Sequence, residues 1–386
     1  MLPFSFGEKP LLFRLRHGMI NSIISKKVTP VQAKKALIAM SGGVDSSVAA
    51  YLTQTAGCHC VGAIAQLCDQ ALLGEKYDPQ NIRDAKSVAE RLGMEFHVLD
   101  GVDQFKEAVV RNFIACYEEG LTPNPCIQCN KHIKFSFLLE KALALGCDLL
   151  VTGHYAQIRK DEATGRYLLY KAVDESKDQS YFLACLNQYQ LSHVHFPLGG
   201  YTKDQIRQIA SEQGFLTAKK KDSQDICFIP SGDYMAFITR YTGKEYPTGA
   251  FLDIEGNTVG QHAGAVRYTL GQRKGLGLAM GAPVYVCSKD MAANTVTVGP
   301  ESALFTATLH ADDWNWLPFP SLAEPLRVMA KARYRHIPQP ATVYPEENGC
   351  ARVVFDTPQR AVTPGQAVVL YQGDMVVGSG TITNTY

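Results

Sequence analysis

The spacing of apolar residues changes twice along the chain, and each change marks a different kind of structure. From residue 36 to about 156, short apolar runs alternate with segments whose apolar residues recur at helical spacing. The runs that predict strands lie at 37–40, 60–65, 95–99 and 148–152. The segments that predict helices lie at 46–55, 79–92, 102–119 and 133–145. This alternation predicts a doubly wound parallel α/β sheet, in which ligands bind beyond the carboxyl ends of the strands.

Two further patterns follow this region. Between about 200 and 300 the segments are short and interrupted by Gly and Pro. After residue 300, six short apolar runs are separated by turn residues, which predicts a small β-barrel or sandwich. The six runs lie at 306–309, 326–330, 341–344, 351–355, 367–371 and 375–383. We therefore expect an N-terminal extension over 1–35, the α/β domain over 36–215, a small central α+β domain over 216–303 and a C-terminal β-barrel over 304–386.

Length and net charge fit a chain of several domains but do not indicate its function. The 386 residues are enough for two or three domains, and 38 Lys and Arg against 37 Asp and Glu give a net charge of +1. The overall charge therefore does not indicate a nucleic-acid partner, and any basic surface must be local. No apolar run approaches the length of about 20 residues that spans a bilayer, so no membrane association is expected.

Cysteine usage points to a compartment. Eleven cysteines, an odd number, without an evident signal peptide favour a reducing cytoplasm, where clustered cysteines are more often catalytic or metal-binding than disulfide-bonded. Most of them lie in apolar contexts and are expected to be small buried hydrophobic residues, namely Cys58, Cys60, Cys68, Cys116, Cys147, Cys185, Cys287 and Cys350. Residues 1–35 carry scattered basic residues, and we assign no function to them. Met19 is an alternative translation start.

The most informative stretch follows the first predicted strand and opens the first predicted helix. It reads Ala39-Met40-Ser41-Gly42-Gly43-Val44-Asp45-Ser46-Ser47. The start of a helix offers unpaired N–H groups and positive potential to a phosphate, and the two glycines let the backbone approach it. Asp45 would repel a phosphate, so it is expected to hold a metal ion such as Mg²⁺ or to orient the turn. The stretch is neither a Walker A motif nor G-x-G-x-x-G, and it resembles the S-G-G-x-D-S loop of ATP pyrophosphatases. An ordinary Gly-Ser turn is the alternative.

A second stretch, residues 122–135, contains a CxxC sequence that runs from Cys126 to Cys129. Two prolines make a rigid loop that enters a helix carrying two lysines. A thiol at the start of a helix beside Lys131 is expected to have a lowered pKa and to be reactive. A zinc half-site and a thioredoxin-like pair are the alternatives. Against them, the sequence has no second CxxC, and the stretch follows a Pro-rich loop instead of a strand.

A third stretch, residues 219–229, places Cys227 between apolar residues, after a run of three lysines. Such a cysteine is usually a core residue, and such a run is usually a solvated face. Taken alone, this stretch favours a structural role for Cys227.

Six motifs occur in a fixed order along the chain. They are S-G-G-V-D-S at 41–46, N-P-C-x-x-C-N-x-x-I-K-F at 124–135, T-G-H-Y-A at 152–156, K-D-Q-S-Y-F at 177–182, S-Q-D-I-C-F-I at 223–229 and G-Q-R-K-G-L-G at 271–277. Together they resemble the bacterial tRNA-specific 2-thiouridylase family, from about residue 36 to the C-terminus. The resemblance implies a PP-loop ATP-pyrophosphatase domain, ATP and Mg²⁺ as cofactors, and a tRNA with a wobble uridine as substrate.

The resemblance also implies a reaction and roles for two cysteines. ATP would adenylate the uracil O2, and a cysteine persulfide would deliver sulfur to the wobble uridine. Cys227 would carry the persulfide, and Cys129 would be the nucleophile that frees the sulfur, leaving a disulfide between them. A sulfur-relay protein or a cysteine desulfurase would supply the persulfide. The ATP-binding residues implied are Ala39, Met40, Ser41, Gly42, Gly43, Val44, Asp45, Ser46, Ala65 and Gly153.

A larger set of residues would contact the tRNA. Those implied by the resemblance are Asn124, Pro125, Cys126, His154, Lys177, Asp178, Gln179, Arg333, Tyr334 and Gln366. Basic side chains would position phosphates, and the target uridine must leave its stack to be reached. A plain solvated surface is the alternative interpretation of the charged members.

One departure from the family leaves the mechanism open. Many members carry Asp where this chain has Cys126, and here Cys126, Cys129 and Cys227 could together ligate a [4Fe–4S] cluster with one open iron. We weigh this against the disulfide relay, which we favour. An amide-forming ATP-pyrophosphatase ligase is a further alternative, but amine attack on an adenylate needs no thiol. A non-enzymatic nucleotide-sensing or tRNA-binding module is another.

Overall fold

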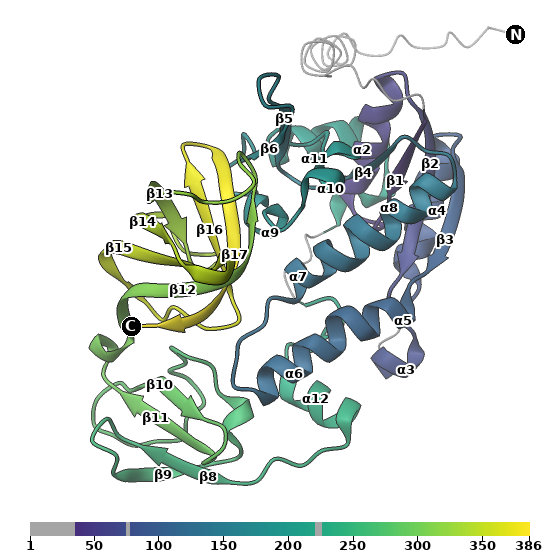
Figure 1. The fold of residues 1–386 in the computed structure, drawn as a ribbon. Coiled ribbons are helices and arrows are strands. Elements are labelled where there is room, and N and C mark those ends of the chain that lie inside the picture. Colours follow the sequence, from purple (N-terminus) through teal and green to yellow (C-terminus); the bar gives the residue numbers. More distant parts are fainter. Residues whose placement is uncertain (1–34, 75–77, 221–225) are drawn as a thin grey trace, which may run out of the picture.

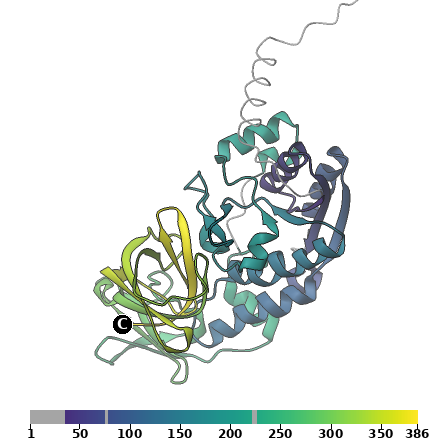
Figure 2. The ribbon, with the colours of Figure 1, turned by 45° about the horizontal axis from the view of Figure 1, so that its top comes forward.

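The computed structural model describes residues 35–74, 78–220 and 226–386, which form an α/β domain, a small central domain and a β-barrel (Figure 1). The barrel lies beside the α/β domain in both views (Figures 1 and 2). All but the last residue of the expected N-terminal extension, and the segment 221–225 of the third stretch, lie outside the described residues. None of the described helices is both long and apolar enough to cross a membrane.

The α/β domain contains the parallel sheet that the apolar pattern predicts. Its strand order is β3-β2-β1-β4-β7, and every neighbouring pair is parallel. The strands are β1 (Lys35–Ala39), β2 (His59–Gln66), β3 (Glu95–Asp100), β4 (Leu149–Thr152) and β7 (Val194–His195). The first four lie where the sequence predicts them. The two-residue strand β7 is too short to give an apolar pattern of its own.

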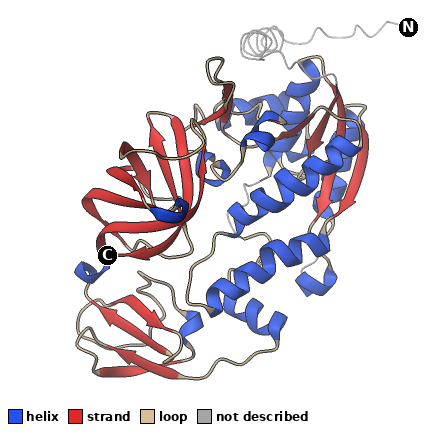
Figure 3. Ribbon diagram, in the orientation of Figure 1, coloured by secondary structure: helices blue, strands red, loops and turns tan. Residues whose placement is uncertain are grey.

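Helices cover both faces of this sheet (Figure 3). One face packs against α2 (Val44–Thr55), α4 (Gln80–Arg91) and α11 (Lys203–Glu212). The other packs against two long helical stretches with π-helical middles: α5 (Val102–Phe105) to α6 (Asn112–Glu118), and α7 (Pro125–Gln128) to α8 (Leu138–Ala144). Along β1, Ala36 and Ile38 face one core and Leu37 faces the other. This two-sided burial explains why the strands read as continuous apolar runs.

One expected helix boundary is wrong. The helix predicted over 133–145 begins at Pro125, because Pro125 occupies the first helical position and the Asn124 side chain accepts a hydrogen bond from Ile127 N at 3.3 Å. The two cysteines of the CxxC sequence therefore lie on the helix and not in the loop before it. Cys129 begins the π-helical segment that runs to Phe137.

The central domain combines one helix with a small sheet. The helix is α12 (Tyr234–Thr242), and the strand order is β10-β11-β8-β9. The strands are β8 (Gly249–Leu252), β9 (Thr258–His262), β10 (Tyr285–Asp290) and β11 (Thr295–Gly299). Phe251, Val286, Val296 and Val298 form the centre of its own core.

The C-terminal domain is a closed barrel of six strands, all of which the sequence predicts. They are β12 (Phe305–Trp316), β13 (Leu326–Lys331), β14 (Gln339–Pro345), β15 (Ala351–Arg360), β16 (Ala367–Gln372) and β17 (Met375–Thr385). Pairing of β12 with both β15 and β17 closes the barrel. An unpredicted hairpin of the α/β domain, β5 (Gln157–Lys160) and β6 (Tyr167–Tyr170), extends the barrel sheet, because β6 pairs with β17.

Short elements complete the fold. The remaining α-helices are α3 (Gln70–Leu73), α9 (Ser180–Leu183) and α10 (Gln188–Ser192). Single 3₁₀ turns occur at Leu216–Lys219, Ala265–Arg267, Glu301–Leu304 and Glu347–Gly349. Among these, α3 follows β2 at the edge of the site described next.

Candidate active site

A cavity of about 430 Å³ lies beyond the carboxyl ends of β1, β2 and β4, where a doubly wound sheet binds its ligands. Most of the expected ATP-binding residues line it, namely Ala39, Met40, Ser41, Asp45, Ser46, Ala65 and Gly153. The other three, Gly42, Gly43 and Val44, belong to the same loop and to the start of α2. Expected sulfur- and tRNA-site residues Cys227, His154 and Gln179 line the same cavity. The structure therefore brings the two sets of residues to one place.

The Ser41–Ser46 loop is held open toward the cavity by its own hydrogen bonds. Ser41 N donates to Ser46 Oγ at 3.1 Å, and Ser47 Oγ donates to Gly43 O at 2.8 Å. Gly42 has a φ of +69°, and a Cβ there would lie 2.4 Å from Asn81 O. Only glycine fits this position, which explains the first glycine of the motif. Gly43 caps α2 without a side-chain hydrogen bond, so the helix start keeps N–H groups for an anion.

Asp45 orients the loop through a buried lysine that the sequence analysis missed. Lys203 Nζ, from α11, donates to both Asp45 carboxylate oxygens at 2.8 Å, and Tyr155 Oη–H donates to Oδ1 at 2.7 Å. Asp45 was expected either to hold a metal ion or to orient the turn, and these hydrogen bonds support the second role. The lysine also neutralises a charge that would repel phosphate. Because Lys203 lies 158 residues after Asp45, nothing local in the sequence links them.

Close packing brings β4 against this loop. A Cβ on Gly153 would lie 2.8 Å from both Asp45 C and Ser46 N. The glycine of the T-G-H-Y-A motif is thus required for the close approach of the end of β4 to the start of α2.

Replacing Lys203 by methionine is expected to lower the free energy of unfolding by about 2 kcal/mol, because Asp45 loses a buried partner but keeps partial access to solvent. Urea unfolding measures this loss. The matched control is Lys244→Met, which breaks an exposed ion pair with Glu118 and should cost less than about 1 kcal/mol. Equal losses in the two variants would contradict the structural role of Lys203.

The three cysteines that the sequence analysis selects differ in exposure. Cys126 is exposed, Cys129 is 8% exposed, and Cys227 is exposed toward the cavity. The three thiols lie near enough to affect one another's charge. The apolar neighbours of Cys227 predict a core position for it, and this prediction is wrong. Phe228 and Ile229 beside it are the buried residues.

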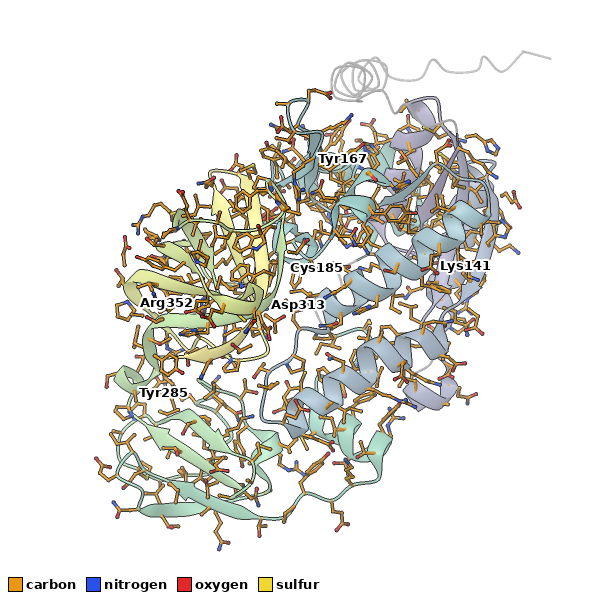
Figure 4. All side chains as sticks on the ribbon, in the orientation of Figure 1. Lys141, Tyr167, Cys185, Tyr285, Asp313 and Arg352 are labelled. Carbon is orange, nitrogen blue, oxygen red and sulfur yellow. The ribbon has the colours of Figure 1, made fainter. Side chains whose placement is uncertain are left out.

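The predicted lowering of the Cys129 pKa is wrong. Burial raises the pKa of Cys129, and the cation that opposes this shift is Lys134, not Lys131. Lys131 Nζ instead donates to Asp313 of β12 at 2.6 Å, where the barrel meets the helix (Figure 4). Although Cys227 is exposed as a residue, the protein atoms around its sulfur and the neighbouring thiols raise its pKa as well. The local sequence shows charges near a thiol, but it does not show how much protein surrounds it.

Lys134 is a second functional candidate that the sequence analysis did not select. It lines the cavity, and its Nζ lies 3.3 Å from His154 Nε2. A lysine ammonium only donates, so Nε2 accepts and the proton lies on Nδ1, which donates to Thr152 Oγ1 at 2.7 Å. Burial lowers the pKa of His154 well below its usual value, which keeps the ring neutral. His154 therefore holds the ammonium toward the cavity.

The expected tRNA contacts divide between the cavity rim and the domain interface. Gln179 Oε1 accepts from Tyr155 N at 2.9 Å beside the cavity. Gln366 Nε2 donates to Thr122 O at 2.9 Å and Pro123 O at 3.0 Å, so the barrel holds the loop that carries Asn124 and Pro125. The structure shows these residues in protein contacts near the site and leaves their contact with tRNA a prediction.

The remaining expected tRNA residues occupy the same interface. Arg333 donates to Leu270 O at 3.3 Å, which joins the barrel to the central domain. Tyr334 packs on Phe182 with ring centroids 4.3 Å apart. In the loop before α9, Asp178 accepts from Ala172 N at 3.0 Å, and Lys177 belongs to the same loop.

The three thiols are also candidate metal ligands. Within the part of the chain that the structure describes, no group of three His, Cys, Asp or Glu side chains is placed to hold a metal ion. Cys126, Cys129 and Cys227 nevertheless lie near one another, and both the iron–sulfur cluster and the disulfide between Cys129 and Cys227 stay predictions.

The fold and the cavity define an ATP-binding PP-loop enzyme domain joined to two smaller domains. Comparison with family models gives the same division: a tRNA methyl transferase HUP domain matches residues 34–231, a tRNA methyl transferase PRC-barrel domain matches 235–300, and an aminomethyltransferase beta-barrel domain matches 306–382.

Curated relatives match nearly the full chain. The tRNA-specific 2-thiouridylase MnmA of Clostridioides difficile (strain 630) is 46% identical over 353 residues, which are 90% of this chain and 98% of that protein. Those of Acetivibrio thermocellus and Heliobacterium modesticaldum are 47% and 48% identical and cover 90% of this chain, with 99% and 91% of their own lengths matched. The chain belongs to the tRNA-specific 2-thiouridylase MnmA family.

Proposed function

We propose that this protein is a tRNA uridine 2-sulfurtransferase, which uses ATP to replace the O2 oxygen of a wobble uridine by sulfur. One observation carries the proposal: the PP-loop and Cys227 line a single cavity, and the thiols of Cys126 and Cys129 lie near Cys227. The cytoplasm is the proposed compartment, and a tRNA and a persulfide-donating protein are the proposed partners. Family membership supports the substrate class.

The first proposed step is adenylation. The phosphates of ATP lie at the start of α2, where the Ser41 and Ser46 hydroxyls and the free N–H groups donate to them. The adenosine moiety lies toward Ala65 and Gly153. Mg²⁺ accompanies ATP and supplies charge neutralisation at the phosphates. The uracil O2 attacks the α-phosphorus, pyrophosphate leaves, and O2 becomes part of a good leaving group.

The second proposed step is sulfur transfer. Cys129 attacks Cys227 Sγ of the persulfide, so the Cys129–Cys227 bond forms and the terminal sulfur leaves as hydrosulfide. This sulfur adds to C2 of the activated uridine, and AMP leaves with the former O2 oxygen. Lys134, held by His154, faces the cavity, where a thiolate and the departing phosphate carry negative charge. Its ammonium stabilises negative charge on the thiolate and on the departing phosphate.

Two alternatives are less well supported. An amide-forming ligase would use the same loop, but it gives no reason for thiols beside the adenylate. A cluster-dependent version of the same reaction would use Cys126, Cys129 and Cys227 as ligands, whereas no group of three ligating side chains among the described residues is placed to hold a metal ion.

The proposal is tested by measuring pyrophosphate release from Mg-ATP with and without unmodified tRNA. Release that requires a tRNA with uridine at the wobble position is the expected result. The control tRNA carries cytidine at that position and should give only background. Equal release with both, or with neither, would reject tRNA as the group that is adenylated. Release that depends instead on a small amine or acid would favour the ligase.

A further inference from the structure

A fourth cysteine lies at the sulfur site, and the sequence analysis treated it as a buried hydrophobic residue. Cys68 is half-buried and lines the same cavity as Cys227. Its thiol lies near enough to Cys129 and to Cys227 for charges on these groups to interact. Three segments far apart in the sequence thus bring thiols together: the end of β2, the α7 helix and the segment around Cys227.

The position of Cys68 is fixed. It lies two residues after β2, directly before Asp69, which caps α3 by accepting from Leu72 N at 2.7 Å. The other carboxylate oxygen of Asp69 accepts from Lys106 Nζ at 2.8 Å. Cys68 also packs against the core that contains Cys129 and Phe228. A thiol held in this way has a defined direction of approach to the sulfurs around it.

Access to the cavity separates the cysteines into two kinds. Cys129 is buried and does not line the cavity, whereas Cys68 and Cys227 both do. Sulfur transfer as proposed above leaves a Cys129–Cys227 disulfide, and the site works again only after Cys129 is free. In that disulfide, the Cys227 sulfur is the one that a second thiol in the cavity can reach.

We propose that Cys68 is a resolving thiol, which takes the place of Cys129 in the disulfide after each sulfur transfer; this rests on the proposed function. The Cys68 sulfur attacks Cys227 Sγ, the Cys68–Cys227 bond forms and the Cys129–Cys227 bond breaks. The electron pair leaves with Cys129, which takes up the proton that Cys68 lost. The exchange consumes no oxidant or reductant. An external dithiol then reduces the Cys68–Cys227 disulfide from the cavity.

The surroundings of Cys68 keep its thiol protonated until it reacts. Burial, Asp69 and Cys129 raise the pKa of Cys68 to about 12, and Lys106 opposes this shift. The exchange therefore depends on the position of Cys68 beside Cys227 in the cavity and on transfer of its proton during the attack.

The first test needs neither tRNA nor ATP. Reduced protein is oxidised with diamide, which takes two electrons and two protons from a thiol pair, and disulfide-linked peptides are mapped by mass spectrometry. A Cys68–Cys227 link is expected in the wild type and should increase in Cys129→Ser, where Cys227 can no longer pair with Cys129. The matched control is Cys116→Ser, which removes a half-buried thiol of α6 and should leave the map unchanged. Absence of any Cys68–Cys227 link in Cys129→Ser would overturn the proposal.

The second test follows turnover. In Cys68→Ser, the rate of repeated turnover with a dithiol reductant is expected to fall about tenfold more than the rate of the first turnover. Equal effects on both rates would also overturn the proposal. If the wild type forms no 2-thiouridine at all, the proposed function fails, and the peptide map still decides whether Cys68 and Cys227 can pair.

Discussion

Cys129→Ser is expected to form no measurable 2-thiouridine, a loss of at least about a thousandfold, because a serine hydroxyl does not attack a persulfide sulfur at neutral pH. Adenylation uses other residues, so tRNA-dependent pyrophosphate release should stay within about threefold of wild type. Mass spectrometry of digested tRNA and a pyrophosphate assay measure the two quantities on the same sample. The separation of the two activities is the signature of a nucleophile that acts after adenylation.

A matched substitution controls for the loss of a thiol as such. Cys185→Ser removes a half-buried cysteine that lies near the barrel interface, outside the cavity lining (Figure 4). It should keep thiolation within about twofold of wild type. A Cys129→Ser variant that still thiolates tRNA would remove Cys129 from the mechanism. A variant that loses pyrophosphate release as well would indicate damage to the cavity and not to the sulfur step.

Gly42→Ala is expected to lower tRNA-dependent pyrophosphate release about a hundredfold, because the loop must move to relieve a Cβ placed 2.4 Å from Asn81 O. The φ of +69° adds strain for any L side chain. Weakened ATP binding in calorimetry should accompany the loss of rate. Thiolation should fall in proportion, since sulfur transfer requires the adenylate.

The control for this substitution lies at the other end of the same helix. Gly57 has a φ of +91°, but a Cβ there meets no atom within 4 Å. Gly57→Ala therefore carries the conformational strain without the clash and should keep pyrophosphate release within about threefold of wild type. Similar losses in both variants would show that the effect comes from strain around α2 and not from the shape of the phosphate loop.

The fold follows from local patterns to a large extent. Four strands of the parallel sheet and all six barrel strands appear in the sequence as apolar runs, because each is bounded by turn residues and buried on a defined face. The hairpin β5–β6 was not predicted, since its register depends on pairing with β17, more than 200 residues later. The start of the helix at Pro125 was missed, although Asn124 followed by proline is a recognisable cap.

The site was predicted less completely than the fold. The Ser41 loop and the CxxC cysteines were found from their local patterns, whereas the role of Cys227 came only from the resemblance to a known family. Lys203 and Cys68 were missed, since each acquires its place only when distant segments meet. The pKa of Cys129 was predicted in the wrong direction, because local charges are visible in a sequence and burial is not. Local motifs therefore show where the site lies, whereas contacts between distant segments set the partners and pKa values of its side chains.

The central claim is that thiols of this chain, without a metal centre, deliver sulfur to an adenylated uridine. The most direct measurement is thiolation of unmodified tRNA by metal-stripped protein under anaerobic conditions, with Mg-ATP and a persulfide donor. The account predicts 2-thiouridine at the wobble position and, after a single turnover, a disulfide that contains Cys227. Product that forms only after iron and sulfide are restored, or no product under either condition, would contradict it.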